Sequence, residues 1–425
     1  MNGSPAAQRE RDRPFDCSKI PLGEAAACLV GEFLHIAGEM ESRQRARRAE
    51  DLRRHEAMAS ALVLDLAHRT LSQPDGWVTV SLQNDDYSPA RRQAPFLTQR
   101  FVDLLNLLAS DPEILEMRRG IARRGGGGER TTVRAGARLL RVFAVADIAL
   151  TDIGRDRSIL KNSLVLMGPK LRGSAEVLPI PDTAETRLLR VEVQAINEFL
   201  AQADLDWLGD VVDDKIDLSD RFVFRVFNNG SFKDGGRLFG GFWHCKDKLE
   251  GVCFGQHRAV ALDYGQMGVR AAYVQAGLVP PEGDLYSVPG LQPYRKGVKT
   301  VLSALLAADK IPTAFPKGVR KDGLFPSSWK FARVLEPIAE FHSPIRHLFG
   351  TKLCFRLMYE ESCLLIKVLL RLKDLGVVAL PLHDGILVSN EHLSIGESTM
   401  RIKYHEHFGV DGVVDVSYPI TSYNL

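Results

Sequence analysis

Two aspartates that are far apart in the sequence stand where metal ligands are often placed. Asp263 ends an apolar, β-branched run that begins at Ala259, and a strand of this kind would hold the carboxylate rigidly at the rim of a sheet. Asp384 lies at the bend of residues 376–389, which are typical of strand, tight turn and strand. If folding joins them, the two carboxylates can share two divalent cations roughly 3.5 to 4 Å apart, an arrangement that promotes phosphoryl transfer. Oxygen ligands favour Mg²⁺ or Mn²⁺ over softer metals.

Between the two aspartates lies a basic helical segment. Arg295 and Lys299 are four residues apart, so on a helix they project from one face. Two cations at this spacing could grip a triphosphate. A solvent-facing basic helix is the alternative interpretation.

In chain order these segments resemble three motifs of the DNA polymerase I-type (family A) polymerases. They are also similar to the related single-subunit phage-type RNA polymerases and to minimal relatives carried by plasmids and phages. The resemblance covers roughly residues 222–420. The matching positions are Asp263, Tyr264, Gln266 and Arg270 for motif A, Arg295 and Lys299 for motif B, and His383 and Asp384 for motif C. Two further segments, Gly236–Leu238 and Gly283–Tyr286, resemble stretches that precede and follow motif A in that superfamily.

The resemblance implies a role for each matching residue. Asp263 and Asp384 are implied to hold two Mg²⁺ ions, and Lys299 to protonate the leaving pyrophosphate. The residues implied to bind the nucleotide are Arg295, Lys299, Tyr264, Gln266 and Gly268, and those implied to contact nucleic acid are His383, Arg237 and Arg270. Structural ion pairs for the two arginines, and a carbonyl partner for the histidine, remain alternatives.

The sequence departs from the superfamily pattern at several positions. Family A DNA polymerases carry Glu beside the sugar 2′ position, whereas this chain has Gly268, the residue type of the RNA polymerase relatives, so the choice of sugar stays open. Gly385 replaces an accessory acid after motif C. The base-stacking residues of motif B are absent, since Ser303, Ala307 and Ala308 stand in their places.

A long apolar helix is predicted over residues 357–375, under the sheet that carries the aspartates. Glu360 and Glu361 near its start could reach the metal site. The alternative for both glutamates is that they only complement the helix dipole, as acids in a first helical turn commonly do.

A second candidate surface lies in the first half of the chain. Residues 118–141 contain eight arginines and one acid, Glu129, around the four glycines 125–128, which predict a mobile loop. We expect contacts with a nucleic-acid backbone there, with an ordinary basic surface as the alternative. The arginines concerned are Arg118, Arg119, Arg123, Arg124 and Arg130.

Composition limits the class of protein. The chain has 425 residues, of which 45% are hydrophobic and 25% charged, as in soluble globular proteins of two or three domains. The net charge of +2 means that any affinity for nucleic acid depends on local clusters of positive charge. Six cysteines are too few for a disulfide framework and indicate reduced thiols, hence a cytoplasmic protein. No signal peptide or apolar stretch long enough to cross a membrane is present.

These observations predict an α+β fold of two domains. We expect a disordered leader over residues 1–20, a helix-rich, thumb-like domain that grips nucleic acid over 21–205, and a right-hand polymerase-like palm sheet over 206–425 with helical fingers inserted near 284–345. The predicted function is that of a template-directed nucleotidyltransferase, a compact DNA polymerase that takes primer, template and nucleoside triphosphates. The alternatives are an RNA polymerase or primase, and a DNA-binding replication protein without catalytic activity.

Overall fold

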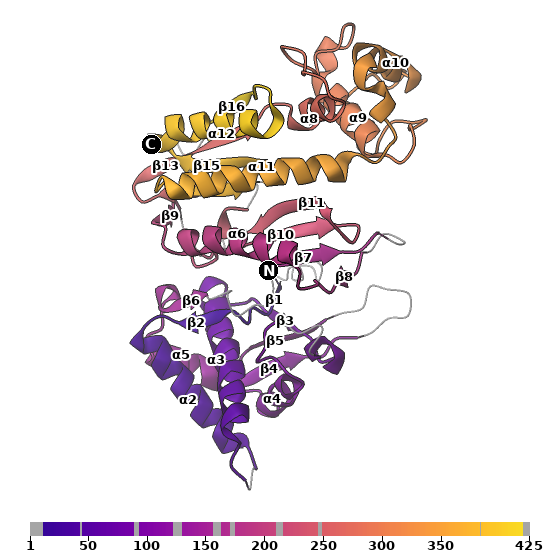
Figure 1. The fold of residues 1–425 in the computed structure, drawn as a ribbon. Helices are drawn as coiled ribbons and strands as arrows, with labels where there is room; N and C mark the ends of the chain where they lie inside the picture. Colours follow the sequence, from indigo (N-terminus) through magenta and orange to yellow (C-terminus); the bar gives the residue numbers. More distant parts are fainter. Residues whose placement is uncertain are drawn as a thin grey trace. The chain divides into compact units, whose positions relative to one another are not determined.

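The chain folds into two compact units in the computed structural model (Figure 1). Unit 1 comprises residues 1–162 and 209–220, and unit 2 comprises residues 163–208 and 221–425. The structure describes residues 12–42, 45–88, 93–121, 130–155, 163–170, 175–209, 216–244, 249–382 and 384–419.

The described residues of unit 1 form four α-helices, which pack with a small mixed sheet. The sheet has the order β1-β3-β5-β4, and a separate pair joins β2 to β6. Apolar residues on the inner faces of the helices, such as Phe33, Leu62 and Phe101, are fully buried in one core. The elements are β1 (Arg13–Pro14), β2 (Lys19–Pro21), α2 (Glu24–Met40), α3 (Ala49–Ser72), β3 (Val78–Val80), α4 (Arg100–Leu108), β4 (Leu115–Arg118), β5 (Thr131–Ala135), α5 (Ala137–Val145) and β6 (Ile153–Arg155).

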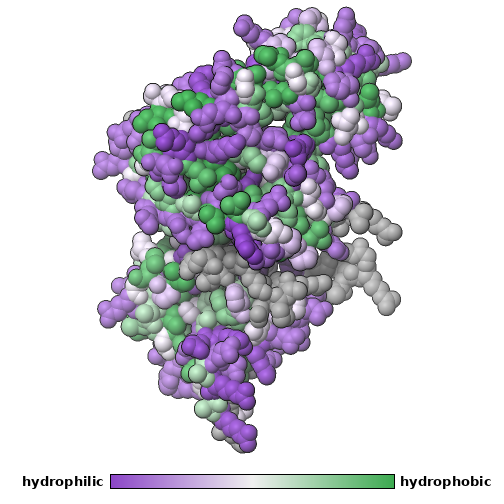
Figure 2. All heavy atoms as spheres, in the orientation of Figure 1, coloured by the Kyte–Doolittle hydropathy of each residue, from purple (hydrophilic) through white to green (hydrophobic). Residues whose placement is uncertain are grey.

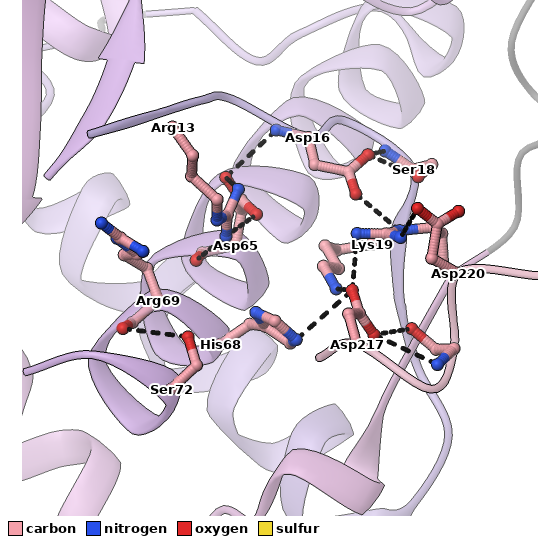
Figure 3. A network of polar contacts seen from close by, with 12 residues as sticks. Arg13, Asp16, Ser18, Lys19, Asp65, His68, Arg69, Ser72, Asp217 and Asp220 are labelled. Carbon is pink, nitrogen blue, oxygen red and sulfur yellow. Dashed lines mark hydrogen bonds and ion pairs between the residues drawn. The ribbon is translucent and has the colours of Figure 1, made fainter. Parts of the chain in front are cut away.

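A buried network of charges joins the returning segment 216–220 to the rest of unit 1 (Figure 3). The Asp217 carboxylate is 2.5 Å from Lys19 Nζ, 2.5 Å from Arg155 Nη2 and 3.4 Å from His68 Nε2. Burial alone would raise the pKa of Asp217, but the hydrogen bond with His68 and the charges of Lys19 and Arg155 hold it well below its usual value. Burial lowers the pKa of Lys19, whose side chain is fully enclosed. Each charge here depends on its partners, since little water reaches the network.

The described residues of unit 2 form two sheets. The smaller sheet has the order β11-β10-β7-β8, with β7 and β10 parallel. Arg225 on β10 is 1% exposed and donates to Gly236 O of β11 at 2.9 Å and to Ser362 Oγ at 2.8 Å, so it ties this sheet to a long helix, α11. The bounds are β7 (Leu164–Met167), β8 (Val177–Leu178), α6 (Ala184–Ala201), β10 (Val223–Asn228), β11 (Ser231–Gly240) and α11 (Cys354–Asp374).

The larger sheet of unit 2 has β13 (His257–Tyr264) at its centre. β15 (Gly385–Ser389) pairs with one edge of β13, and β12 (Val252–Phe254) and β16 (Val414–Ser417) pair with successive halves of the other edge. All these pairings are antiparallel. The outer strands are β14 (Ala379–Leu382) beside β15 and β9 (Leu205–Trp207) beside β12.

Helices cover and extend this sheet. α11 packs on β14 and on β11, and it contacts α12 (Leu393–Phe408), which follows β15. A cluster of α8 (Met267–Gln275), α9 (Arg295–Ala307) and α10 (Ala332–Phe341) gathers at one end of unit 2 around its own apolar core (Figure 1). This core includes Tyr273, Val298 and Ile338. The cluster thus follows directly from the strand that carries Asp263.

The predicted boundaries are corrected in two places. Residues 12–20 are not a disordered leader, because Cys17, Ser18 and Lys19 are at most 2% exposed in the core of unit 1; residues 1–11 lie outside the described residues. Unit 1 ends at residue 162 instead of 205, since α6 and β7 belong to unit 2, and residues 209–220 return to unit 1. Unit 1 also contains a sheet as well as the predicted helices. No helix among the described residues is both long and apolar enough to span a membrane.

The Asp217 network makes a prediction about stability. Replacing Asp217 by Ala leaves Lys19 buried without its partner, so we expect the free energy of unfolding of unit 1 to fall by about 3–5 kcal/mol. In wild type this contribution is complete above the ordinary aspartate pKa of about 3.9 and is lost as the pH falls through the lowered pKa of the folded protein. Urea unfolding followed by hydrogen exchange in α3 measures both effects.

The matched control is Asp103→Ala, which removes an exposed ion pair with Arg100 on α4 of the same unit. We expect that variant to change the free energy of unfolding by less than about 0.5 kcal/mol. Equal effects of the two substitutions would contradict the role given to Asp217.

Candidate active site

The register of the larger sheet brings the two predicted aspartates together. On the edge shared by β13 and β15, Asp263 is the direct partner of Gly385, the residue that follows Asp384. Along β13 the side chains alternate between the two faces of the sheet. Tyr264 is buried against α12, whereas Asp263 points to the opposite face and is exposed at the end of the strand. The juxtaposition on which the sequence interpretation depends is therefore present.

Gly385 has a structural reason to lack a side chain. A Cβ at this position would lie 2.4 Å from Leu262 O and 3.1 Å from the Asp263 carboxylate. The residue that departs from the motif C pattern thus leaves space for Asp263 beside the hairpin. A larger residue would displace either the strand or the carboxylate.

The electrostatics of Asp263 fit a cation site. Although Asp263 is exposed to solvent, nearby protein atoms exclude part of its hydration, and this desolvation together with the charge of Asp384 raises its pKa to about 7. Lys299 lowers that pKa, which puts α9 within electrostatic reach of the aspartates. A divalent cation would relieve the same repulsion that the proton relieves.

Two further carboxylates belong to this region. Asp415 on β16 is the direct partner of Asp263 across the other edge of β13, so the two side chains share a face of the sheet, and its charge further raises the pKa of Asp263. Glu361 of α11 is 5% exposed, and burial, together with the charges of Asp384 and Asp263, raises its pKa to about 8 despite the opposing charge of Arg237. The sequence named Glu361, with Glu360, as an acid that could reach the metal site. Nothing in the sequence indicated that Asp415 would lie there.

Arg237, predicted to contact nucleic acid, is engaged by Glu361. Its Nε donates to Glu361 Oε1 at 2.6 Å, while the side chain is 26% exposed. The ion pair fixes the guanidinium beside the carboxylate cluster. A contact with nucleic acid stays a prediction for this residue.

The cations of α9 face the cluster from the helical side. Lys299 is exposed, and Arg295 forms a two-pronged ion pair with Asp284, with Nε and Nη2 at 2.5 and 3.1 Å from the carboxylate oxygens. The hydrogen bond with Asp284 raises the pKa of Arg295, with a smaller contribution from Asp415. Arg295 is therefore held in a defined orientation near the same acids.

Tyr286 is a site residue that sequence reasoning missed. The Arg295 guanidinium lies 5.3 Å and Lys299 Nζ 6.0 Å from its ring centre. Burial, with contributions from Asp284 and Asp384, raises the pKa of its hydroxyl to about 12, so it stays protonated at neutral pH. Its segment is anchored by His342, whose Nε2 is 3.0 Å from Leu285 O. The only sequence signal was its place in the segment Gly283–Tyr286.

Three residues near motif A take structural roles. Tyr264 is 3% exposed and donates to Met400 O at 2.8 Å, so its side chain is withdrawn from the predicted nucleotide-binding set. Arg270 is 5% exposed and donates to Gly283 O at 2.8 Å, which corrects its predicted contact with nucleic acid. Gln266, with a left-handed φ of 59°, accepts from Leu285 N at 2.7 Å. Arg270 and Gln266 thus secure the segment that carries Asp284 and Tyr286.

Gly268 lies in the first turn of α8. A Cβ built there meets no atom within 4 Å, so the protein itself leaves space for a side chain at this position. Gly268 therefore remains available for the predicted contact with a nucleotide.

The basic segment of unit 1 is only partly described. Arg118 lies over Trp77, with 3.9 Å from its guanidinium carbon to the ring centre, Arg119 donates to Asn106 Oδ1, and Arg130 is exposed. The other arginines of the described segment pair with glutamates, namely Arg134 with Glu116, Arg138 with Glu39 and Arg141 with Glu113. Arg123 and Arg124, like His383 of the hairpin, lie outside the described residues. Because these three arginines pair with glutamates, the segment carries less uncompensated positive charge than its number of arginines suggests.

The chemistry of the site suits a hard divalent cation. Within the described part of the chain no group of three or more His, Cys, Asp and Glu side chains is arranged to hold a metal ion. The fit of Mg²⁺ or Mn²⁺ therefore depends on the carboxylate oxygens of Asp263 and Asp384. The raised pKa of Asp263 and the space that Gly385 leaves beside it match such an ion. Backbone, water and substrate oxygens would have to complete the coordination.

Comparison with known proteins adds little to this geometry. No family model matches the chain, and the search of curated proteins found no match. Among solved structures, the POL domain of Pol1 from M. smegmatis in complex with DNA primer-template and dNTP aligns with a TM-score of 0.32 and 13% identity, over 55% of this chain and 51% of that one. The chain thus spans about half of that structure, and a likeness this weak decides neither fold nor function.

The raised pKa of Asp263 predicts how metal binding depends on pH. A cation must displace the proton, so the affinity for Mn²⁺ should fall on the order of tenfold per pH unit below pH 7 and level off above it. Without metal, the stability contributed by Asp263 decreases as the pH rises from about 4, the value in the unfolded chain, to 7, because the folded state binds the proton more tightly. Calorimetric titration with Mn²⁺ in buffers of different ionisation enthalpy counts the protons released.

Asp263→Asn should abolish both the binding and the proton release. Asp411→Asn is the matched control, because its side chain is 97% exposed beside His405. Binding by wild type that does not change between pH 6 and pH 8 would contradict this assignment.

Proposed function

We propose that this chain is a template-directed nucleotidyltransferase that extends a nucleic-acid strand with nucleoside triphosphates. The observation that carries the proposal is the pairing of β13 with β15, which sets Asp263 beside the hairpin of Asp384, with α9 in electrostatic reach. In this proposal the larger sheet is a polymerase palm and the α8–α10 cluster its fingers.

Each group has a defined task in such a reaction. Two Mg²⁺ ions held by Asp263 and Asp384 would supply activation of the attacking oxygen and charge stabilisation. Lys299, exposed on α9, can bind the triphosphate and donate a proton to the leaving pyrophosphate. Arg295 is pre-oriented by Asp284, and the Tyr286 hydroxyl remains a hydrogen-bond donor at neutral pH. Fixed cations of this kind stabilise negative charge that develops on phosphate oxygens.

Synthesis of DNA from a primer is the leading form of this proposal. The second candidate is synthesis of RNA, by an RNA polymerase or a primase. It is favoured by Gly268, which leaves open space where family A DNA polymerases place the glutamate that crowds the sugar.

Primer extension tests the proposed reaction. Wild type should incorporate labelled nucleotides in the presence of Mg²⁺ or Mn²⁺, and Asp263→Ala and Asp384→Ala should each lose at least about 10³-fold in rate, since each removes a metal ligand. Lys299→Ala should lose on the order of 10²- to 10³-fold. Gel analysis of extended primers gives the rates.

The matched controls each remove one charge of the same sign as the tested variants. Asp411→Ala and Lys296→Ala remove exposed charges outside the cluster and should extend primers at the wild-type rate. Equal activity of wild type and both aspartate variants would contradict the metal assignment. DNA binding without synthesis, retained in Asp384→Ala, would identify a replication protein that only binds DNA.

Gly268 tests the choice of sugar. Gly268→Glu should fold, because the space around the Cβ is open and an acid in a first helical turn is favourable. We expect it to lower incorporation of ribonucleotides about 10- to 100-fold relative to deoxynucleotides, since a side chain there would crowd the 2′ hydroxyl. Competition between dNTP and rNTP, with Gly268→Ala as the smaller substitution, measures the ratio. An unchanged ratio in Gly268→Glu would remove Gly268 from the sugar pocket.

A further inference from the structure

A strongly basic segment, the 308–333 loop, joins α9 to the first turn of α10. It contains six cationic residues and two acids, whereas the whole chain has a net charge of only +2. All six cationic side chains are exposed. Among the described residues, no carboxylate pairs with Lys317, Lys321 or Lys330. The six are Lys310, Lys317, Arg320, Lys321, Lys330 and Arg333.

Two of these cations lie over aromatic rings. The Arg320 guanidinium carbon lies 4.5 Å from the ring centre of Phe315, and that of Arg333 lies 4.1 Å from the ring centre of Trp329. Arg320 also donates to backbone carbonyls of its own loop, at 3.1 Å to Pro326 O and 2.9 Å to Ser327 O. Its position is therefore set by neutral groups, and its positive charge stays free for an anion.

The loop is fixed to the helix that carries Arg295 and Lys299. Phe325 packs so closely on Gly297 of α9 that a Cβ there would lie 2.6 Å from its ring. Phe325 in turn stacks on Trp329, and Tyr294, next to Arg295, meets the edge of Trp329 at 4.9 Å between ring centres. The basic loop thus packs through its aromatic side chains on α9, the helix that carries Arg295 and Lys299. Figure 2 shows hydrophilic surface interspersed with hydrophobic side chains over this part of unit 2.

We propose that the 308–333 loop binds single-stranded nucleic acid, as the unpaired template that continues beyond the site on α9. Unpaired strands are held by positive charge along the backbone and by flat groups on which bases stack, and the loop provides both in alternation. Arg320 and Arg333 offer guanidinium planes, and the lysines offer phosphate contacts. The identity of the strand as template rests on the proposed polymerase function, whereas binding of a single strand does not.

The test measures binding, without nucleotides or catalysis. Fluorescence anisotropy compares a blunt duplex with the same duplex carrying a single-stranded 5′ overhang of ten nucleotides, at several salt concentrations. Wild type should bind the overhang duplex at least tenfold more tightly. The variant Lys317→Ser/Lys321→Ser should lose most of that difference, and the salt slope should shrink by about 1.4, which is 0.7 for each lost contact with a single strand.

The control Lys170→Ser/Lys233→Ser removes the same charge from other exposed positions of unit 2 and should bind as wild type does. Trp329→Ala reports on stacking and should weaken overhang binding without changing the salt slope. Equal affinity of wild type for blunt and overhang duplexes, equal losses in the two lysine pairs, or polyglutamate competing as well as a single strand would each overturn the inference. Loss of overhang binding in a protein that extends no primer would leave this inference standing and refute the proposed function.

Discussion

The antiparallel pairing of β13 with its two neighbours is the constraint on which the candidate site depends. Because β13 lies between β15 and β16, the residues opposite Asp263 are Gly385 on one edge and Asp415 on the other. A shift of one residue in either register would turn Asp263 toward the core that holds Tyr264. The geometry of backbone hydrogen bonds, more than any side-chain contact, therefore assembles the carboxylates.

Placing several carboxylates close together is unfavourable, because their negative charges repel one another. Neighbouring residues of unit 2 compensate part of this charge. Burial, together with this repulsion, raises the pKa values of Asp263 and Glu361, and the charges of Lys299 and Arg237 offset part of the shift. Glu361 comes from α11, a helix that packs on both sheets of the unit, so the carboxylate cluster is tied to the core on which it lies. Such a cluster has a deficit of positive charge that a substrate-bound cation would supply.

Unit 1 handles buried charge differently. Asp217 is surrounded by Lys19, His68 and Arg155 at hydrogen-bonding or ion-pair distance, so its negative charge is compensated and its pKa is low. The two clusters illustrate opposite uses of aspartate. One is neutralised within the protein and stabilises it, whereas the other is left incompletely neutralised at the end of a strand.

The residue types and local patterns of the sequence determined the strand that ends at Asp263, the hairpin around Asp384 and the helix with Arg295 and Lys299, because each depends on neighbours within a few residues. The sequence could not determine the partners from other elements. Asp415, Glu361 and Tyr286 join the site through strand register and helix packing, and Arg270 and Tyr264 turn inward for the same reason. The path of residues 209–220 back into unit 1 was likewise decided only by the tertiary structure, since the buried charges that bind Asp217 lie up to 198 residues away in the chain.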